Sequence, residues 1–114
     1  MNQNKVIPFS PRQSEALAEI KRRLLARFDI RTFILYGSTA RGHADDESDI
    51  DLLIVTSHPL TRFERHEITN VVFEVNLHYD TNFSTLVVDA RTWETGIISV
   101  LPLHDEIMTD GIRV

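Results

Sequence analysis

Apolar residues recur along this chain with two different periods, and the changes of period predict its elements. From Ser10 to Phe28 the spacing is three to four residues, which is typical of a helix with one buried face. Ser10 can cap the N-terminus of this helix, Pro11 suits its first turn, and Gln13 stands where a capping box needs its second partner. The helix is expected to end near Phe28–Asp29. Its apolar stripe consists of Leu17, Ile20, Leu24 and Phe28, widened by Leu25.

Short apolar runs of strand length occupy residues 31–36 and 50–56, and a third strand is expected over 83–88. Helical spacing returns over 61–79, with Phe63, Ile68, Val71, Val72, Val75 and Tyr79 as its expected buried stripe. Asp89 can cap a short helix that runs through Trp93 and ends at Gly96. A helical turn is expected around 104–108. This order predicts an α/β (α+β) fold in which helices pack against a mixed sheet, within a single domain over 1–114.

The composition of the chain argues against several classes of function. The chain has 114 residues, of which 42% are apolar and 25% charged, as in an ordinary globular domain. A net charge of -5 argues against broad binding to the nucleic-acid backbone, which requires a basic surface. There are no cysteines, which excludes thiolate metal sites and fits a reducing cytoplasm. No apolar run is long enough to cross a membrane.

The chemistry concentrates between the first two strands, in the segment FILYGSTARGHADDESDIDLLIV over 33–55. Asp49 and Asp51 open the second strand two residues apart, so both carboxylates are expected on one face, where they could hold a Mg²⁺ ion. A solvated acidic strand end is the plainer interpretation of such a pair alone. Upstream, Gly37 ends a buried strand and Ser38 follows it, a combination of flexible backbone and donors that suits a phosphate. Residues 39–42 are expected to form one or two helical turns.

These residues carry a resemblance to a known family. Gly37-Ser38, a ten-residue spacer and Asp49-Ile50-Asp51 resemble the signature of the DNA polymerase beta-like nucleotidyltransferase superfamily. The longer strings over 37–42 and 48–53 are especially similar to its minimal nucleotidyltransferases. The order of elements around the motif also matches that family.

The resemblance implies transfer of a nucleoside monophosphate from ATP or another nucleoside triphosphate to an acceptor, with pyrophosphate leaving. Gly37 and Ser38 would hold the triphosphate, and Asp49 and Asp51 would ligate Mg²⁺. Arg41 would add positive charge, unless it pairs instead with Asp45, Asp46 or Glu47. The resemblance further implies an all-helical (HEPN-type) partner protein in a toxin–antitoxin pair. It leaves the acceptor, the base preference and any homo-oligomer open.

The chain departs from the family at one position. Active members usually place a third carboxylate in the middle of a later strand, and the corresponding position here is expected to carry Ser84, or Thr85 if the register shifts by one. Asp80, Asp89 and Glu74 lie near that strand but outside its middle. A catalytically idle nucleotide-binding or antitoxin subunit is therefore the alternative to an active transferase. A plain structural domain with an incidental acidic loop is a third interpretation.

Overall fold

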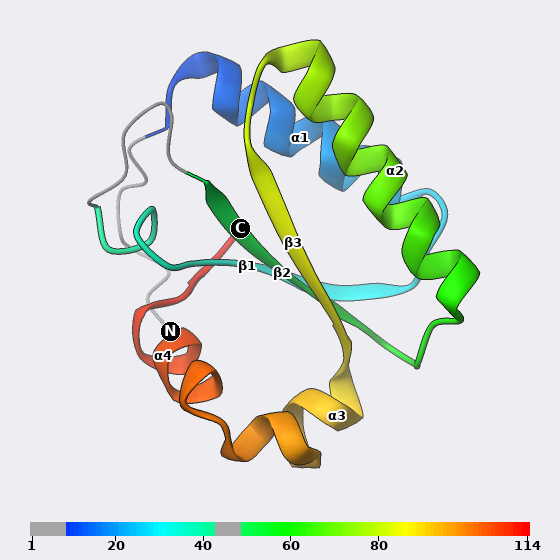
Figure 1. The fold of residues 1–114 in the computed structure, drawn as a ribbon, viewed down its shortest axis with the longest axis vertical. Coiled ribbons are helices and arrows are strands. Elements are labelled where there is room, and N and C mark those ends of the chain that lie inside the picture. Colours follow the sequence, from blue (N-terminus) through cyan, green and yellow to red (C-terminus); the bar gives the residue numbers. More distant parts are fainter. Residues whose placement is uncertain (1–8, 43–48) are drawn as a thin grey trace.

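The computed structural model describes residues 9–42 and 49–114 of the chain, which form helices around a four-stranded sheet (Figure 1). The helices and strands, in chain order, are α1 (Pro11–Leu25), β1 (Ile30–Tyr36), β2 (Ile50–Thr56), α2 (Arg62–Tyr79), β3 (Phe83–Asp89), α3 (Ala90–Thr95), the 3-10 helix η1 (Ile97–Val100), α4 (Pro102–Asp110) and β4 (Ile112–Arg113). Among the described residues, no helix is both long enough and apolar enough to cross a membrane.

The sheet is mixed, as the sequence predicted. Its strand order is β3-β2-β1-β4, in which β2 and β3 are parallel while β1 is antiparallel to both β2 and β4. The parallel pair is joined through α2, because parallel neighbours need a long crossover connection. The two strands that carry the candidate site, β1 and β2, are therefore the two central strands, braced on both sides.

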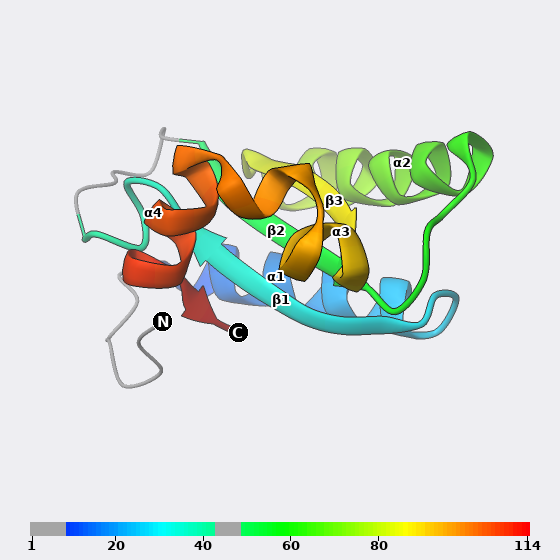
Figure 2. The ribbon, with the colours of Figure 1, turned by 90° about the horizontal axis from the view of Figure 1, so that it is seen from below.

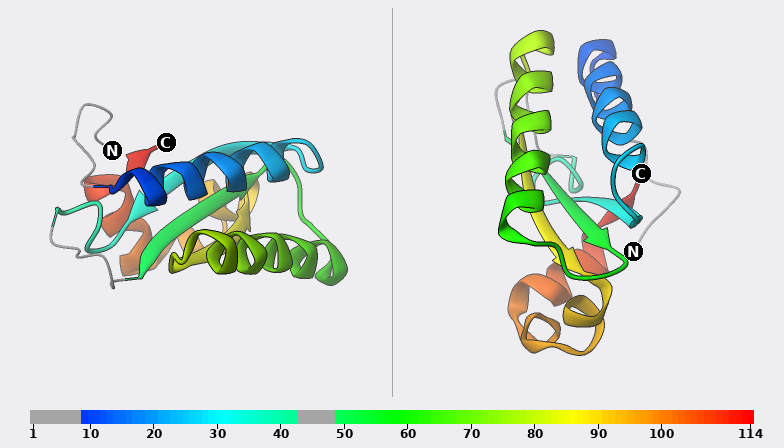
Figure 3. Two further views of the ribbon diagram at one scale, coloured as in Figure 1. Left: turned by 90° about the horizontal axis from the view of Figure 1, so that it is seen from above. Right: turned by 90° about the vertical axis from the view of Figure 1, so that its right-hand side faces the viewer.

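Helices cover both faces of the sheet (Figures 2 and 3). One face packs against α1 and α2, and its core includes Leu35, Leu52 and Ile54. The other face packs against α3 and α4, and its core includes Ile34, Leu53 and Trp93. Successive strand residues alternate between these two cores, which is why β1 and β2 are apolar almost throughout.

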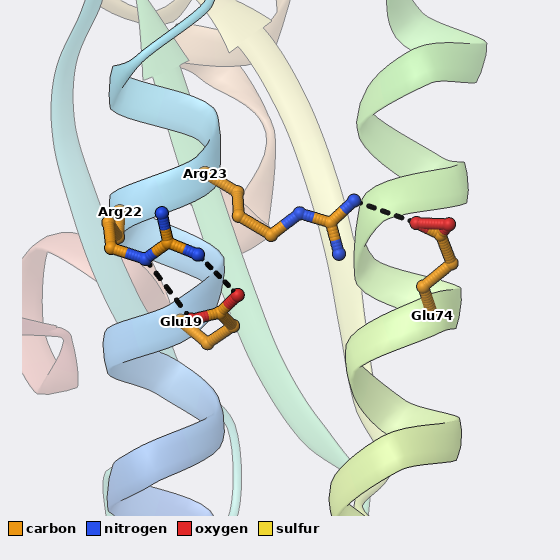
Figure 4. A network of polar contacts seen from close by, with 4 residues as sticks. All are labelled: Glu19, Arg22, Arg23 and Glu74. Atoms are coloured by element: carbon orange, nitrogen blue, oxygen red, sulfur yellow. Dashed lines mark hydrogen bonds and ion pairs between the residues drawn. The ribbon is translucent and has the colours of Figure 1, made fainter.

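Ion pairs reinforce the packing of α1 beside α2. Arg23 of α1 donates to Glu74 of α2 at 2.7 Å, and Arg22 forms two hydrogen bonds with Glu19 on its own helix (Figure 4). Arg27 pairs with Glu67 of α2 in the same way. These pairs are largely exposed, so each contributes less than about 1 kcal/mol, and the buried stripe between the helices supplies most of the stability.

The first long helix begins where its capping signal predicted, and the second, predicted from helical spacing alone, is also capped at its start. Ser10 and Gln13 form a reciprocal capping box, and Thr61 and Glu64 form another at the start of α2. The first helix ends at Leu25, three residues before the predicted end, although Phe28 still donates its N–H to the carbonyl of Leu24.

Two apolar positions were assigned to the wrong side of their helices. Leu25 is 52% exposed and Phe63 is 75% exposed, whereas both were predicted to widen or begin a buried stripe. Leu25 is the last residue of α1, and Phe63 lies in the first turn of α2 on the side away from Ile68 and Val72. Helical spacing alone predicted a stripe wider than the sheet can cover.

Candidate functional site

Asp51 is the second residue of β2, a central strand, and its two neighbours in sequence fix the face of the sheet on which its side chain lies. Ile50 and Leu52 are fully buried beneath α1 and α2, so the alternation of the strand places the Asp51 side chain on the opposite face. There it is paired in register with Tyr36 of β1 and Ser84 of β3. Asp49 immediately precedes β2 and is exposed.

The two carboxylates repel each other enough to affect titration. Burial raises the pKa of the Asp51 carboxyl above its usual value, the negative charge of Asp49 raises it further, and the positive charge of Arg41 partly offsets both. Burial also raises the pKa of the Tyr36 hydroxyl, and the negative charge of Asp51 raises it further. The site therefore gathers negative charge that a cation would neutralise.

Gly37 brings the turn after β1 into contact with Asp51. Its φ of 75° lies in the left-handed region, which is costly for any residue with a side chain. A Cβ atom added at Gly37 would also lie 2.5 Å from the Asp51 Oδ2 atom. Both the backbone conformation and the close approach therefore require glycine here, as was expected for a turn that admits a ligand.

The turn itself presents backbone donors. The N–H groups of Ser38, Thr39 and Ala40 donate to no acceptor in the part of the chain that the structure describes. Consecutive free N–H groups form a concave anion site, the arrangement that binds phosphates in many proteins. Arg41 follows, near enough to Asp51 to lower the pKa of its carboxyl.

The helical turns expected over 39–42 are present only as single hydrogen-bonded turns that begin at Gly37. Residues 37–42 form hydrogen-bonded turns, in which Arg41 donates to the Gly37 carbonyl at 3.2 Å and Gly42 donates to that of Thr39 at 3.1 Å. The alternative partners proposed for Arg41, namely Asp45, Asp46 and Glu47, lie outside the described residues.

Two side chains near the site were not singled out from the sequence. Tyr36 lies beside Asp51 across the β1–β2 pair, and the Thr39 hydroxyl is buried with no hydrogen-bond partner among the described residues. Strand alternation could have indicated Tyr36, since the residue before the glycine ends a strand antiparallel to β2. Nothing in the sequence marks the buried hydroxyl of Thr39.

Ser84, the position where a third carboxylate was sought in the sequence, is exposed and is the direct parallel partner of Asp51. Asp89 instead caps α3 by accepting from the Thr92 N–H and hydroxyl, and Asp80 ends α2 in a left-handed conformation. Within residues 9–42 and 49–114, no group of three or more His, Cys, Asp or Glu side chains could hold a metal.

A hard cation fits the donor set that remains. Asp49 and Asp51 offer two carboxylates whose repulsion Arg41 offsets only in part, and magnesium in nucleotide sites commonly takes one or two carboxylates together with phosphate oxygens and water. The free N–H groups of the neighbouring turn would hold the phosphates of the same ligand. Thus a nucleotide with its metal ion suits the geometry better than a metal ion alone.

The fold is shared with known proteins. A chain in a crystal structure of a toxin–antitoxin pair with AMP-PNP matches 87% of this chain and 69% of its own, with a TM-score of 0.57 and 18% identity. A chain from the complex of tri-AMPylated Shewanella oneidensis HEPN toxin with its MNT antitoxin matches 88% of this chain and 69% of its own, with a TM-score of 0.54 and 18% identity. At this level of identity, the matches show the fold.

Two proteins found by sequence comparison share more identity with this chain than these solved structures do. Two proteins of Methanocaldococcus jannaschii, each named "Putative protein adenylyltransferase", are 36% identical over 83 residues and 35% identical over 81 residues. Each match covers 71% of this chain, and the chain spans 55% of the first relative's length and 75% of the second's. The model of the nucleotidyltransferase domain family matches residues 17–99, a segment that contains β1, the Gly37 turn, β2 and β3. This chain therefore belongs to the nucleotidyltransferase domain family.

Proposed function

We propose that this chain binds a nucleoside triphosphate with Mg²⁺ and transfers the nucleoside monophosphate to a hydroxyl of a partner protein. The observation that supports this most strongly is the close approach of Gly37 to Asp51, because the turn with free N–H groups then lies beside a carboxylate. Phosphate donors and metal-binding acceptors therefore lie side by side. A triphosphate bridged by a metal ion is the ligand that uses both.

Each residue has a distinct role in this proposal. The N–H groups over 38–40 and the Ser38 hydroxyl bind phosphate oxygens, and Arg41 adds positive charge beside them. Asp49 and Asp51 hold Mg²⁺, which when bound neutralises charge on the phosphates and aligns them. The acceptor oxygen bonds to the α-phosphorus, the bond from that phosphorus to the α–β bridging oxygen breaks, and pyrophosphate leaves while the hydroxyl loses its proton.

ATP and a helical partner protein are the proposed substrate and acceptor. The toxin–antitoxin neighbour with AMP-PNP supports an adenine nucleotide, and the neighbour in complex with an AMPylated HEPN toxin supports a partner of that class. The names of the two sequence relatives also describe transfer of an adenylyl group to a protein.

The test uses ATP labelled at one phosphate at a time. With a co-purified HEPN-type partner and Mg²⁺, label from [α-³²P]ATP should remain on the partner, whereas label from [γ-³²P]ATP should not. Asp49→Asn with Asp51→Asn should abolish labelling, and Glu106→Gln, an exposed acid on α4 outside the site, should leave it unchanged. Transfer of the γ-label would contradict nucleotidyl transfer, because it would indicate phosphorylation.

Ser84 favours a second candidate function, in which the chain binds nucleotide and partner without transferring. A hydroxyl is a much weaker magnesium ligand than the carboxylate that active members place there. In this case wild type should leave the partner unlabelled while still forming a complex with it, and the complex should survive the Asp49→Asn and Asp51→Asn substitutions.

Ser84→Asp separates the two candidates further. Because Ser84 is exposed and paired with Asp51, an aspartate there would lie beside the carboxylate pair without disturbing the core. Appearance of α-label only in this variant would support the idle subunit. Equal labelling by wild type and variant would support the transferase and show that the third acid is dispensable here.

A further inference from the structure

A cavity lies on the sheet face that α3 and α4 cover. Its volume is about 530 Å³, within the range of pockets that hold small organic ligands. The residues that line it are Arg31, Thr32, Ile34, Val55, Trp93, Glu94, His104, Met108 and Arg113. No residue of the nucleotide site, from Gly37 to Arg41 or at Asp49 and Asp51, is among them, so this cavity is separate from the site described above.

The walls are apolar and aromatic. Ile34 and Val55 come from the two central strands, and Trp93 comes from α3. The Trp93 ring lies 4.4 Å from the His104 ring, centroid to centroid, with 40° between their planes. Such a wall favours a ligand with a flat apolar body, because aromatic rings contribute both buried area and stacking.

The polar groups of the cavity are incompletely satisfied. The Thr32 Oγ1 and His104 Nδ1 atoms are buried and have no hydrogen-bond partner among the described residues. They account for two of the three such side-chain atoms in the described part of the chain, and the third belongs to Thr39. Neither atom is exposed to the cavity, so a polar ligand pairs with one of them only when the Thr32 or His104 side chain turns toward it. An unpaired buried polar group costs about 1–3 kcal/mol, and such a ligand would recover part of that cost.

The rim carries more positive than negative charge. Arg31 lies 3.8 Å from Glu94, a long pair between two half-exposed side chains that contributes little. Arg113 of β4 has no ion-pair partner among the described residues. One cation therefore remains unbalanced at the mouth of an aromatic cavity.

We infer that this cavity binds a small aromatic anion, such as an aromatic carboxylate. The flat body packs against Ile34, Val55 and Trp93, the carboxylate faces Arg113, and a polar substituent reaches Thr32 or His104. Neither the nucleotide nor the partner protein of the proposed function is needed for this binding.

Trp93 makes the test direct, because it is the only tryptophan in the chain and lines the cavity. Its indole N–H gives a single side-chain signal in a ¹H–¹⁵N correlation spectrum. Titration of the full chain with 4-hydroxybenzoate should shift that signal saturably, with a dissociation constant of about 1 mM or below. The neutral isostere 4-hydroxybenzamide should bind at least about tenfold more weakly, since a charge-assisted hydrogen bond is lost.

Matched variants locate the binding. Arg113→Gln should weaken 4-hydroxybenzoate about tenfold, whereas Arg91→Gln, an exposed arginine on α3 outside the cavity, should not change it. Thr32→Val should weaken binding while keeping or raising the melting temperature, because it removes an unpaired buried hydroxyl. Asp51→Asn should bind the probe as wild type does.

Three results would overturn the inference. They are an unshifted Trp93 signal at saturating probe solubility, equal affinity for the carboxylate and the amide, and unchanged affinity in both Arg113→Gln and Thr32→Val. None of them bears on nucleotide binding, since the two sites share no residue.

Discussion

At the scale of single residues, the candidate site depends on one glycine and two acids. Gly37, in the turn after β1, approaches Asp51 of β2 more closely than a side chain at Gly37 would allow. A folded chain gains nothing in stability from keeping two acids together at this point, since their repulsion raises a pKa. The arrangement is therefore better explained by binding than by folding.

Substitution of Gly37 should separate backbone strain from contact with Asp51. Gly37→Ala and Gly42→Ala both force alanine into the left-handed region, which costs about 1 kcal/mol. Only Gly37→Ala adds a clash, because no heavy atom lies within 4 Å of the Cβ position at Gly42. The clash is with the oxygen at the end of the Asp51 side chain, so it adds the cost of turning that carboxylate, and urea unfolding should show a larger loss for Gly37→Ala. Equal losses would show that the Asp51 carboxylate turns away without cost.

Asp51 should make stability depend on pH in a defined direction. Because the pKa of its carboxyl is raised in the folded chain, that chain keeps the proton to higher pH than the unfolded chain does. The unfolding free energy should then fall as pH rises from the unfolded pKa of about 4 through the raised folded value. Melting curves measured in EDTA should show this loss of stability with rising pH in wild type but not in Asp51→Asn.

The same variant should respond differently to metal. In the proposed function Mg²⁺ binds only the folded site, and it should then raise the melting temperature of wild type at neutral pH but not that of Asp51→Asn. Without metal, Asp51→Asn should be at least as stable as wild type at neutral pH, because it removes a repelling charge. A variant that melts well below wild type in EDTA would show that Asp51 has a structural role that outweighs this repulsion.

At the scale of elements, the connection from α2 to β3 determines what faces Asp51. The Asn76 side chain donates to the Phe83 carbonyl at 3.0 Å and accepts from the Phe83 N–H and the Thr81 hydroxyl, both at 2.9 Å. These three bonds fix the first residue of β3. They thereby set the register that places Ser84 opposite Asp51.

Removal of these bonds should weaken the fold near the site. Asn76→Ala should lower the unfolding free energy by about 2 kcal/mol, since it leaves the backbone of Phe83 without partners. Asn70→Ala, at an exposed position on the same helix, should be close to neutral. Chemical denaturation of the two variants measures the difference, and similar values for both would contradict the role assigned to Asn76.

The sequence predicted the elements better than their arrangement. The apolar runs of β1 and β2, the capping residue Ser10 and the helical spacing over 61–79 predicted where elements begin, because these signals are local. The strand order was not predictable, since β4 is only two residues long and pairs with β1 across most of the chain. Phe63 was assigned to the core because helical period does not reveal how much of a helix the sheet covers.

In the candidate site, too, the residues marked by a local signal were predictable from the sequence. Asp49, Asp51, Gly37 and Ser84 could be identified from a short motif and the two-residue period of a strand. Tyr36 was overlooked although it ends the strand before Gly37, and the buried Thr39 hydroxyl could not be assigned a place, because the conformation of the turn brings it to the site. The cavity beside Trp93 likewise depends on the packing of α3 and α4.

At the scale of the whole molecule, one face of the sheet carries two regions of different chemistry. The ends of β1 and β2 hold the turn and the carboxylates, whereas the cavity beside Trp93 lies further along the same face, between α3 and α4. The α1–α2 layer on the opposite face is packed and joined by ion pairs (Figure 4). It serves as the support on which Ile50 and Leu52 hold Asp51 in place.

The most direct test of the central claim is calorimetric titration of the chain with a non-hydrolysable ATP analogue, with and without Mg²⁺. Wild type should bind one analogue in a Mg²⁺-dependent manner. Asp49→Asn with Asp51→Asn should lose this dependence while keeping its fold, and Glu106→Gln should bind as wild type does. Binding that is absent in wild type, or that depends on Mg²⁺ equally in the double variant, would contradict a shared nucleotide and metal site at Gly37 and Asp51.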